Sequence, residues 1–429
     1  MRRRSGRQSP RAPRILKLGC TLTLLLGLGG CSNGFLPDTL FIYVENESDL
    51  SRQAEIGDSH EAVLQLLKDF EQVNPGVRIQ VQYFPSEAIV PATALRNARA
   101  LGPDLLVTRL FTALQLHEQN LTAPVSFPGK RFDEIHNRFL SRFRLANNQF
   151  LAVPLLAEAQ LACFNKRRVP VPPTSLDELI ALSAKGMRVG LPLSAPDLYW
   201  TTSGSEAKGS LNALLESDNS NAAAPTRLDA VEQRQLRGWL NWLDDANQQL
   251  NVEFAEDVIE LRDRLGKGER DWISCHSLWL GLLGRQLGSS LGVSQLPGRA
   301  GQPATTLTHL KVWSFGEHSS PRQRQLAKAF VLFTLNPVNQ RRLMLDVPGS
   351  LPVNRQVLIP TKSSDRFAVM TASMDNSIML NLRNPHVVEQ QGDQLNDLLR
   401  QLILGTLDVD GVLQDLSAPG GAPPDPGTP

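Results

Sequence analysis

The stretch Phe70-Glu-Gln-Val-Asn-Pro-Gly-Val-Arg-Ile-Gln-Val-Gln-Tyr83 contains the end of a helix, a stop and a strand. Ser59 can cap the helix, and apolar side chains recur on one helical face of the residues that follow it. Asn74-Pro75-Gly76 ends the helix, because these residue types favour a turn. From Val77 onward apolar and polar residues alternate, which predicts a strand with one buried face.

The flanking segments extend this unit in both directions. Thr39–Val44 and Pro103–Val107 read as short buried strands, and Leu110–Gln119 reads as a helix. Strand, helix, strand, helix and strand at this spacing predict parallel βαβ units. Ligands bind beyond the carboxyl ends of such strands, so residues 45–51 and 108–111 are candidate ligand loops.

The rest of the chain continues the mixed pattern. Residues 150–156 and 159–164 read as extended, and 236–246, 321–335 and 387–404 read as helices. Trp239 and Trp242 lie three residues apart on one helical face, which favours core packing over a ligand platform. Trp313 is likewise predicted to be a core residue.

The N-terminus has the order of an export signal. Residues 1–17 hold six Arg and one Lys without an acidic residue, and 13 mostly apolar residues follow. That run is shorter than the ~20 residues of a membrane-spanning helix. It ends in Leu28-Gly-Gly-Cys31, which resembles the bacterial lipobox. We therefore expect a signal peptide over 1–30 and a lipid on Cys31, with an uncleaved anchor or cleavage without lipid as alternatives.

Composition limits the function further. Removing residues 1–30 leaves 37 basic and 43 acidic residues, a net charge of −6, which argues against general nucleic-acid binding. The remaining 399 residues suit two lobes better than one core. Cys163 and Cys275 can pair or remain buried free thiols, and the sequence leaves both open.

Five sequence motifs, in the order in which they occur along the chain, resemble those of the extracellular solute-binding proteins of ABC importers. The type they resemble is the sugar-binding, maltose-binding-protein-like one. The resemblance covers nearly all of residues 39–416. It rests on Phe70–Ile79, Gly102–Val107, Leu151–Leu155 with Phe164-Asn-Lys166, Ala327–Pro337, and Gly349-Ser-Leu-Pro-Val-Asn354. It implies a two-lobed α/β fold of the type II periplasmic-binding-protein kind, each lobe a mostly parallel sheet flanked by helices, joined by crossing hinge segments.

The resemblance also implies a domain layout. The segments are a signal peptide at 1–30, a lipidated tether at 31–38, lobe 1 at 39–152 and 310–352, lobe 2 at 156–307 and 356–416, and a tail at 417–429. The tail holds five Pro and three Gly with one charge, so we expect it to be disordered.

The implied function is that of a binding protein, not an enzyme. It would capture a neutral carbohydrate or polyol-like solute between the lobes and deliver it to the transmembrane subunits of an ABC permease. We expect a monomer without cofactor or metal, held by its lipid on the outer side of the cell membrane, facing the periplasm or exterior.

Two segments depart from the family's pattern at the cleft. Thr308-His309-Leu310 stands where the family has Gly-Gly-Trp, and Cys275-His276-Ser277 replaces a small polar run, while Trp279 keeps an aromatic nearby. Glu158 is a carboxylate between apolar residues, which favours a position at a ligand-binding site. The predicted ligand-binding residues are Glu45, Glu47, Arg109, Glu158, Tyr199, Trp200, His276, Trp279 and His309.

Other function classes are weighed by their motifs. A hydrolase would show a Gly-x-Ser-x-Gly nucleophile elbow or His-Glu-x-x-His. The second motif does not occur, and the letters of the first occur only at 30–34, across the predicted lipidation site, and at 288–292, neither of which is identified as an elbow. The seven His are scattered without metal-ligand spacing, and the three Tyr lie in distant segments, unlike the clustered Tyr of ferric-iron binders. A non-sugar ligand and a sensor or scaffold on the same fold remain alternatives.

Overall fold

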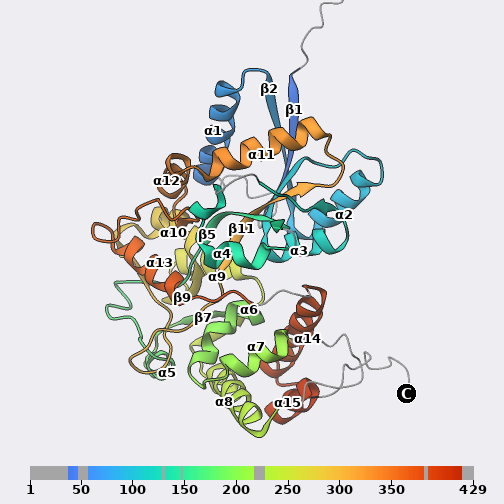
Figure 1. The fold of residues 1–429 in the computed structure, drawn as a ribbon. Coiled ribbons are helices and arrows are strands. Elements are labelled where there is room, and N and C mark those ends of the chain that lie inside the picture. Colours follow the sequence, from blue (N-terminus) through green and yellow to red (C-terminus); the bar gives the residue numbers. More distant parts are fainter. Residues whose placement is uncertain are drawn as a thin grey trace, which may run out of the picture.

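The computed structural model describes residues 37–46, 57–127, 131–145, 148–216, 228–380 and 385–417. They form two mixed sheets flanked by helices, which confirms the expected two-lobed α/β fold (Figure 1). The predicted signal peptide, the lipidation site Cys31 and the tail beyond residue 417 lie outside these residues.

The first sheet begins with the predicted βαβ unit. β1 (Asp38–Asn46) pairs in parallel with β2 (Val77–Pro85) and β3 (Leu105–Arg109), and every other pairing in this sheet is antiparallel. Parallel pairing is therefore confined to three strands. The antiparallel strands are β4 (Thr122–Ala123), β5 (Val153–Glu158), β11 (His309–Gly316) and β12 (Ser350–Pro352).

The predicted cap is confirmed for the helix that starts at Pro321, whereas the helix over residues 57–73 starts before Ser59, so the prediction that Ser59 caps it is wrong. α1 (Gly57–Val73) ends before Asn74, and Phe70 on this helix packs edge-on against Phe330 of α11 (Pro321–Leu335), with ring centroids 5.0 Å apart. α11 starts with a capping box at Ser320 and proline at its first position. The other helices of this half are α2 (Ser86–Asn97), α3 (Leu110–Glu118), α4 (Asn137–Leu140) and α12 (Pro337–Asp346).

The second sheet has the order β10-β6-β9-β7-β8, again mixed, with two parallel pairs (β9-β7 and β7-β8) and two antiparallel pairs (β10-β6 and β6-β9). The strands are β6 (Gln160–Asn165), β7 (Val189–Pro192), β8 (Val252–Ala255), β9 (Trp272–His276) and β10 (Leu291–Ser294). The helices of this half are α5 (Leu176–Ala184), α6 (Ala195–Leu198), α7 (Lys208–Glu216), α8 (Ala230–Asn247), α9 (Val258–Gly266), α10 (Leu280–Leu287), α13 (Asp365–Asp375), α14 (Pro385–Ile403) and α15 (Val409–Ser417).

The predicted core tryptophans pack inside the molecule. Trp239 is fully buried, and its indole N–H donates to Thr201 Oγ1 at 2.7 Å. Trp313 is also buried and donates to Thr334 Oγ1 at 3.1 Å. These hydrogen bonds satisfy the polar atom of each ring, so both side chains can be enclosed at little cost.

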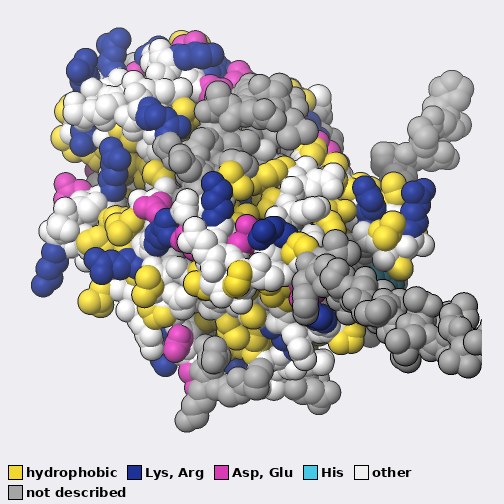
Figure 2. All heavy atoms as spheres, turned by 90° about the horizontal axis from the view of Figure 1, so that it is seen from above, with side chains coloured by type: hydrophobic (Ala, Val, Ile, Leu, Met, Phe, Trp, Pro, Cys, Tyr) yellow, Lys and Arg dark blue, Asp and Glu magenta, His cyan; other side chains and the backbone are white. Residues whose placement is uncertain are grey.

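Within the described residues no helix is long and apolar enough to cross a membrane. On the face shown in Figure 2, Lys and Arg side chains are interspersed with Asp and Glu. That face lacks the continuous basic patch expected of a nucleic-acid-binding surface.

Candidate functional site

A cavity of about 410 Å³ lies where strands of the two sheets end close to one another. Its wall combines residues from β3 and α3, the end of β5, the β7–α6 turn, the end of β9 and the start of β11. A second cavity of about 360 Å³ shares Arg109, Phe111, Pro196 and Asn396 with it, so the two are parts of one cleft.

Glu158 reaches the cavity because the chain changes sheets beside it. β5 ends at Glu158 in the first sheet and β6 begins at Gln160 in the second, with only Ala159 between them. Glu158 pairs with His309 of β11 in antiparallel register. Directly opposed residues project to the same face of a sheet, and both of these line the cavity.

Asp197 is fixed beside the two cleft histidines. Ser194, which caps α6, donates from its hydroxyl to Asp197 Oδ2 at 2.7 Å. His276 Nε2 lies 2.9 Å from Asp197 Oδ1, and the rings of His276 and His309 meet edge to face with centroids 4.6 Å apart. From behind, the Gln160 amide donates to the Asp197 carbonyl at 2.7 Å. The carboxylate is thus held in one orientation at the cavity wall.

The electrostatic environment keeps Asp197 ionised. Burial raises the pKa of Asp197, but the charge and hydrogen bond of His276, the charge of His309 and the Ser194 hydroxyl lower it by more. The net pKa lies well below the usual value of an aspartate.

Trp279 and Phe111 both contribute aromatic rings to the cavity wall, and Trp279 is the one that the sequence predicted. It ends the short 3-10 turn Ser277–Trp279 that follows β9, and its ring contacts His276 edge-on with centroids 5.0 Å apart. The sequence prediction placed it here.

The other predicted aromatics lie elsewhere. Tyr199 and Trp200 are both fully buried, and neither lines the cavity. Trp200 packs against Trp272, and the Tyr199 hydroxyl donates to Asn212. The short helix α6 turns these side chains inward, so the geometry gives them a packing role.

Glu45 acts through Arg109 rather than at the wall itself. Its fully buried carboxylate accepts from the Arg109 backbone N–H at 2.6 Å, from Arg109 Nε at 3.0 Å and from Thr112 Oγ1 at 2.9 Å. This fixes the start of α3 and holds the half-exposed Arg109 side chain at the cavity. Glu47 lies outside the described residues.

Residues 65–369 match the family described as bacterial extracellular solute-binding protein. The chain belongs to this family. In structure it is similar to an ABC transporter solute binding protein from Thermotoga lettingae TMO bound with alpha-D-tagatose, with a TM-score of 0.70 and 13% identity. The match covers 89% of this chain and 98% of the other, and at that identity it shows the fold alone. No curated protein matches in sequence.

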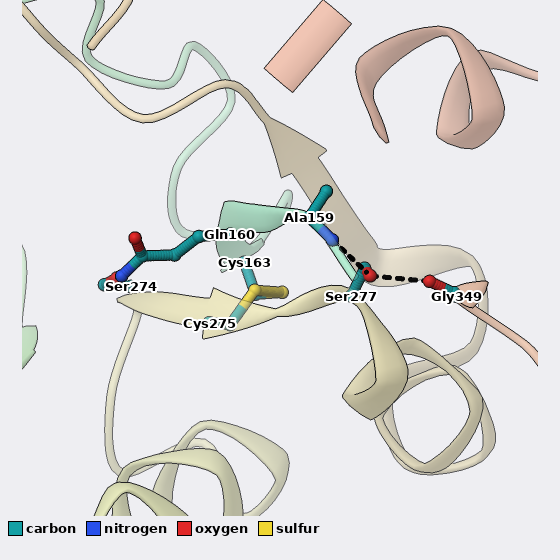
Figure 3. Close-up of a disulfide and its surroundings, with 7 residues drawn as sticks. All are labelled: Ala159, Gln160, Cys163, Ser274, Cys275, Ser277 and Gly349. Atoms are coloured by element: carbon teal, nitrogen blue, oxygen red, sulfur yellow. Dashed lines mark hydrogen bonds between the residues drawn. A yellow bond between two sulfur atoms is a disulfide. The ribbon is translucent and has the colours of Figure 1, made fainter. Parts of the chain in front are cut away.

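The crossing segments of this solute-binding protein are tied to the end of β9 (Figure 3). The buried Ser277 hydroxyl accepts from the Ala159 backbone N–H at 3.0 Å and donates to the Gly349 carbonyl at 2.5 Å. Cys163 of β6 and Cys275 of β9 form a disulfide nearby, which decides a question that the sequence left open. The bond joins the neighbouring strands β6 and β9 at Cys275, the residue immediately before the cavity residue His276.

Among the wall residues of this solute-binding protein that sequence reasoning missed are Ser194, Asp197 and Asn396. The first two carried a signal, since Ser194-Ala-Pro-Asp197 follows a short buried strand and has the pattern of a helix start at a strand's carboxyl end. Asn396 carried none: it lies in the middle of α14, and only its Oδ1, which accepts from the Ala195 N–H at 2.7 Å, links it to the site.

Proposed function

We propose that this protein captures a neutral carbohydrate or polyol-like solute in the cleft and delivers it to an ABC permease. Family membership makes it an exported solute-binding protein, and the similar Thermotoga protein is bound with a sugar. The observation that carries the proposal is a wall combining the Trp279 ring with hydrogen-bonding groups of Arg109, Glu158, Asp197 and Asn396. Such a wall suits a solute with apolar ring faces and many hydroxyls.

The size of the cleft narrows the solute. The cleft has one part of about 410 Å³ and an adjoining part of about 360 Å³, so it lies within the roughly 300–1,000 Å³ of ordinary ligand pockets. Only two large aromatic rings, Trp279 and Phe111, lie in the described wall, so it offers few stacking platforms. We infer a mono- or disaccharide, or a glycosylated polyol, over a long oligosaccharide.

The remaining parts of the proposal concern how the protein works in the cell. A solute that contacts both lobes favours the closed arrangement, and the closed form is what the permease subunits would bind. A lipid on Cys31 would keep this monomeric receptor on the outer face of the membrane, and residues 31–38 would form a tether between the lipid and the two lobes. Lobe 1 would comprise residues 39–152 and 310–352, and lobe 2 residues 156–307 and 356–416. We infer binding without catalysis.

A thermal-shift screen tests the proposal. Sugars, compatible solutes and amino acids are added separately to the purified protein, since a ligand that binds only the native state raises its melting temperature. We expect a carbohydrate or glycosylated polyol to raise it, and Trp279→Ala and Glu158→Gln to abolish the shift. No shift with any carbohydrate would refute the proposal, whereas an unchanged shift in both variants would refute only the site assignment.

A further inference from the structure

Asp197, His276 and His309 bring three metal-ligating groups to one point of the cleft. One carboxylate oxygen and one nitrogen from each imidazole all lie within 4.8 Å of one another. The three side chains are partly buried, and each lines the cavity. From this convergence we propose that the solute-binding protein holds a divalent transition-metal ion of the zinc type on Asp197, His276 and His309.

The distances fit such an ion with small movements. Zinc lies about 2.0–2.1 Å from imidazole nitrogens and carboxylate oxygens, so two ligand atoms of a tetrahedral site are about 3.3 Å apart. His276 Nε2 and Asp197 Oδ1 are already 2.9 Å apart. The widest separation is at most 4.8 Å, so it has to close by at most about 1.5 Å on metal binding.

The choice of metal follows from the ligand types. Calcium and magnesium take oxygen ligands almost exclusively, whereas two imidazoles and one carboxylate suit zinc and its transition-metal neighbours. Three protein ligands leave a fourth position, which here faces the cavity. A solute hydroxyl or the Glu158 carboxylate, which projects to the same face as His309, can complete the set.

The surroundings have the support that metal ligands need. Ligating groups are oriented by hydrogen bonds from behind, and loss of those partners weakens metal binding. Here Ser194 orients the Asp197 carboxylate and Gln160 holds its backbone carbonyl. Gln160 also faces His276 across the β6–β9 pair.

The ion would connect the two lobes. Asp197 and His276 belong to the second sheet and its connections, whereas His309 opens β11 of the first sheet. A ligand that contacts both lobes stabilises the arrangement in which all three groups meet. Metal binding would therefore favour the closed cleft even without solute.

Titration with zinc alone tests this inference independently of any carbohydrate. Isothermal titration of chelator-treated full-length protein near neutral pH should show one Zn²⁺ per chain. His276→Asn and His309→Asn should each weaken binding at least about 100-fold, since each removes a ligand. Acidification to about pH 5 should weaken it as well, because protons compete for the imidazoles.

His318→Asn is the matched control, because His318 is exposed and lies outside the cleft wall. It should bind zinc as the unaltered protein does. Thermal unfolding without zinc shows that the variants fold, and if one cleft variant does not, the other decides. Absence of stoichiometric zinc binding, or wild-type affinity in folded His276→Asn and His309→Asn, would overturn the proposal. Solute binding in the presence of chelator bears only on the proposed function.

Discussion

Replacing Glu45 by glutamine removes one charge and one acceptor from a fully buried position. The native carboxylate accepts three hydrogen bonds, two of them from Arg109 and one from Thr112. In Glu45→Gln, an amide NH₂ must face at least one of these donors. Either the backbone N–H of Arg109 or its guanidinium then loses its partner.

The cost follows from the burial of each group. A buried donor left without a partner costs about 1–3 kcal/mol, and hydrogen bonds to a charged group contribute about 1.5–3 kcal/mol. The Arg109 side chain is 48% exposed, so water screens its attraction and we discount that part to about 0–1 kcal/mol. We expect Glu45→Gln to lower the free energy of unfolding by about 2–3 kcal/mol.

Urea unfolding followed by tryptophan fluorescence measures this loss. The matched control is Asp410→Asn, which breaks the exposed ion pair with Arg237 and should change stability by less than about 0.5 kcal/mol. Arg109→Ala provides the second arm, because it removes the guanidinium but keeps the backbone N–H. In that background the amide oxygen can accept from the backbone N–H while the NH₂ group faces the Thr112 hydroxyl, so Glu45→Gln should cost clearly less than in the unaltered protein.

Two results would contradict this reasoning. A Glu45→Gln cost no larger than that of Asp410→Asn would mean that the buried network contributes little. An undiminished cost in the Arg109→Ala background would mean that a donor of Arg109 left without a partner is not the source of the loss. A weaker solute affinity in Glu45→Gln would show in addition that the Glu45 carboxylate positions Arg109 at the cavity wall.

Further outcomes follow from the core, from one ion pair and from the hinge. Trp200→Ala should lower the free energy of unfolding by about 3–5 kcal/mol, whereas Trp279→Ala should leave it unchanged and weaken solute binding. Thermal melting and solute titration measure the two effects, and the reverse pattern would show that Trp200 binds the solute and Trp279 packs in the core. Burial raises the pKa of Asp271, but the hydrogen bonds from Arg188 lower it by a larger amount, so the net pKa of Asp271 is below the usual value of an aspartate. Asp271→Asn should therefore cost about 1–3 kcal/mol above about pH 5, and the difference from the unaltered protein should shrink as the pH falls below about 4; a constant difference in urea titrations would contradict it. Gly349 has φ +90°, and an added Cβ would collide with the backbone of the turn after β9. Gly349→Ala should therefore lower the melting temperature strongly. An unchanged melting temperature would show that the backbone at this crossing segment can move aside.

Local sequence patterns predicted most secondary structure. Apolar periodicity, stop signals and caps located both ends of α11 and the end of α1, because these signals lie in or beside the elements, whereas the start of α1 was predicted too late at Ser59. They did not predict that β5, β11 and β12 add antiparallel strands to the first sheet, since strand direction depends on where distant segments meet.

The candidate site was predicted in part. Arg109, Glu158, His276, Trp279 and His309 do line the cavity. Tyr199 and Trp200 resembled ligand aromatics as strongly as Trp279 did, but one helical turn after β7 directs them into the core. Burial of an aromatic ring is decided by the packing around it, which a short sequence segment does not contain.

The sequence by itself determined the βαβ start, the export pattern and the family resemblance, because each is encoded in contiguous residues. It also showed seven histidines without metal-ligand spacing. Only the tertiary structure brought His276 next to Asp197, 79 residues away, and next to His309 on the other sheet. The physical reason is the crossing at Ala159: it joins β5 to β6 and so brings the strand ends of two sheets to one cleft, a proximity that no local pattern records.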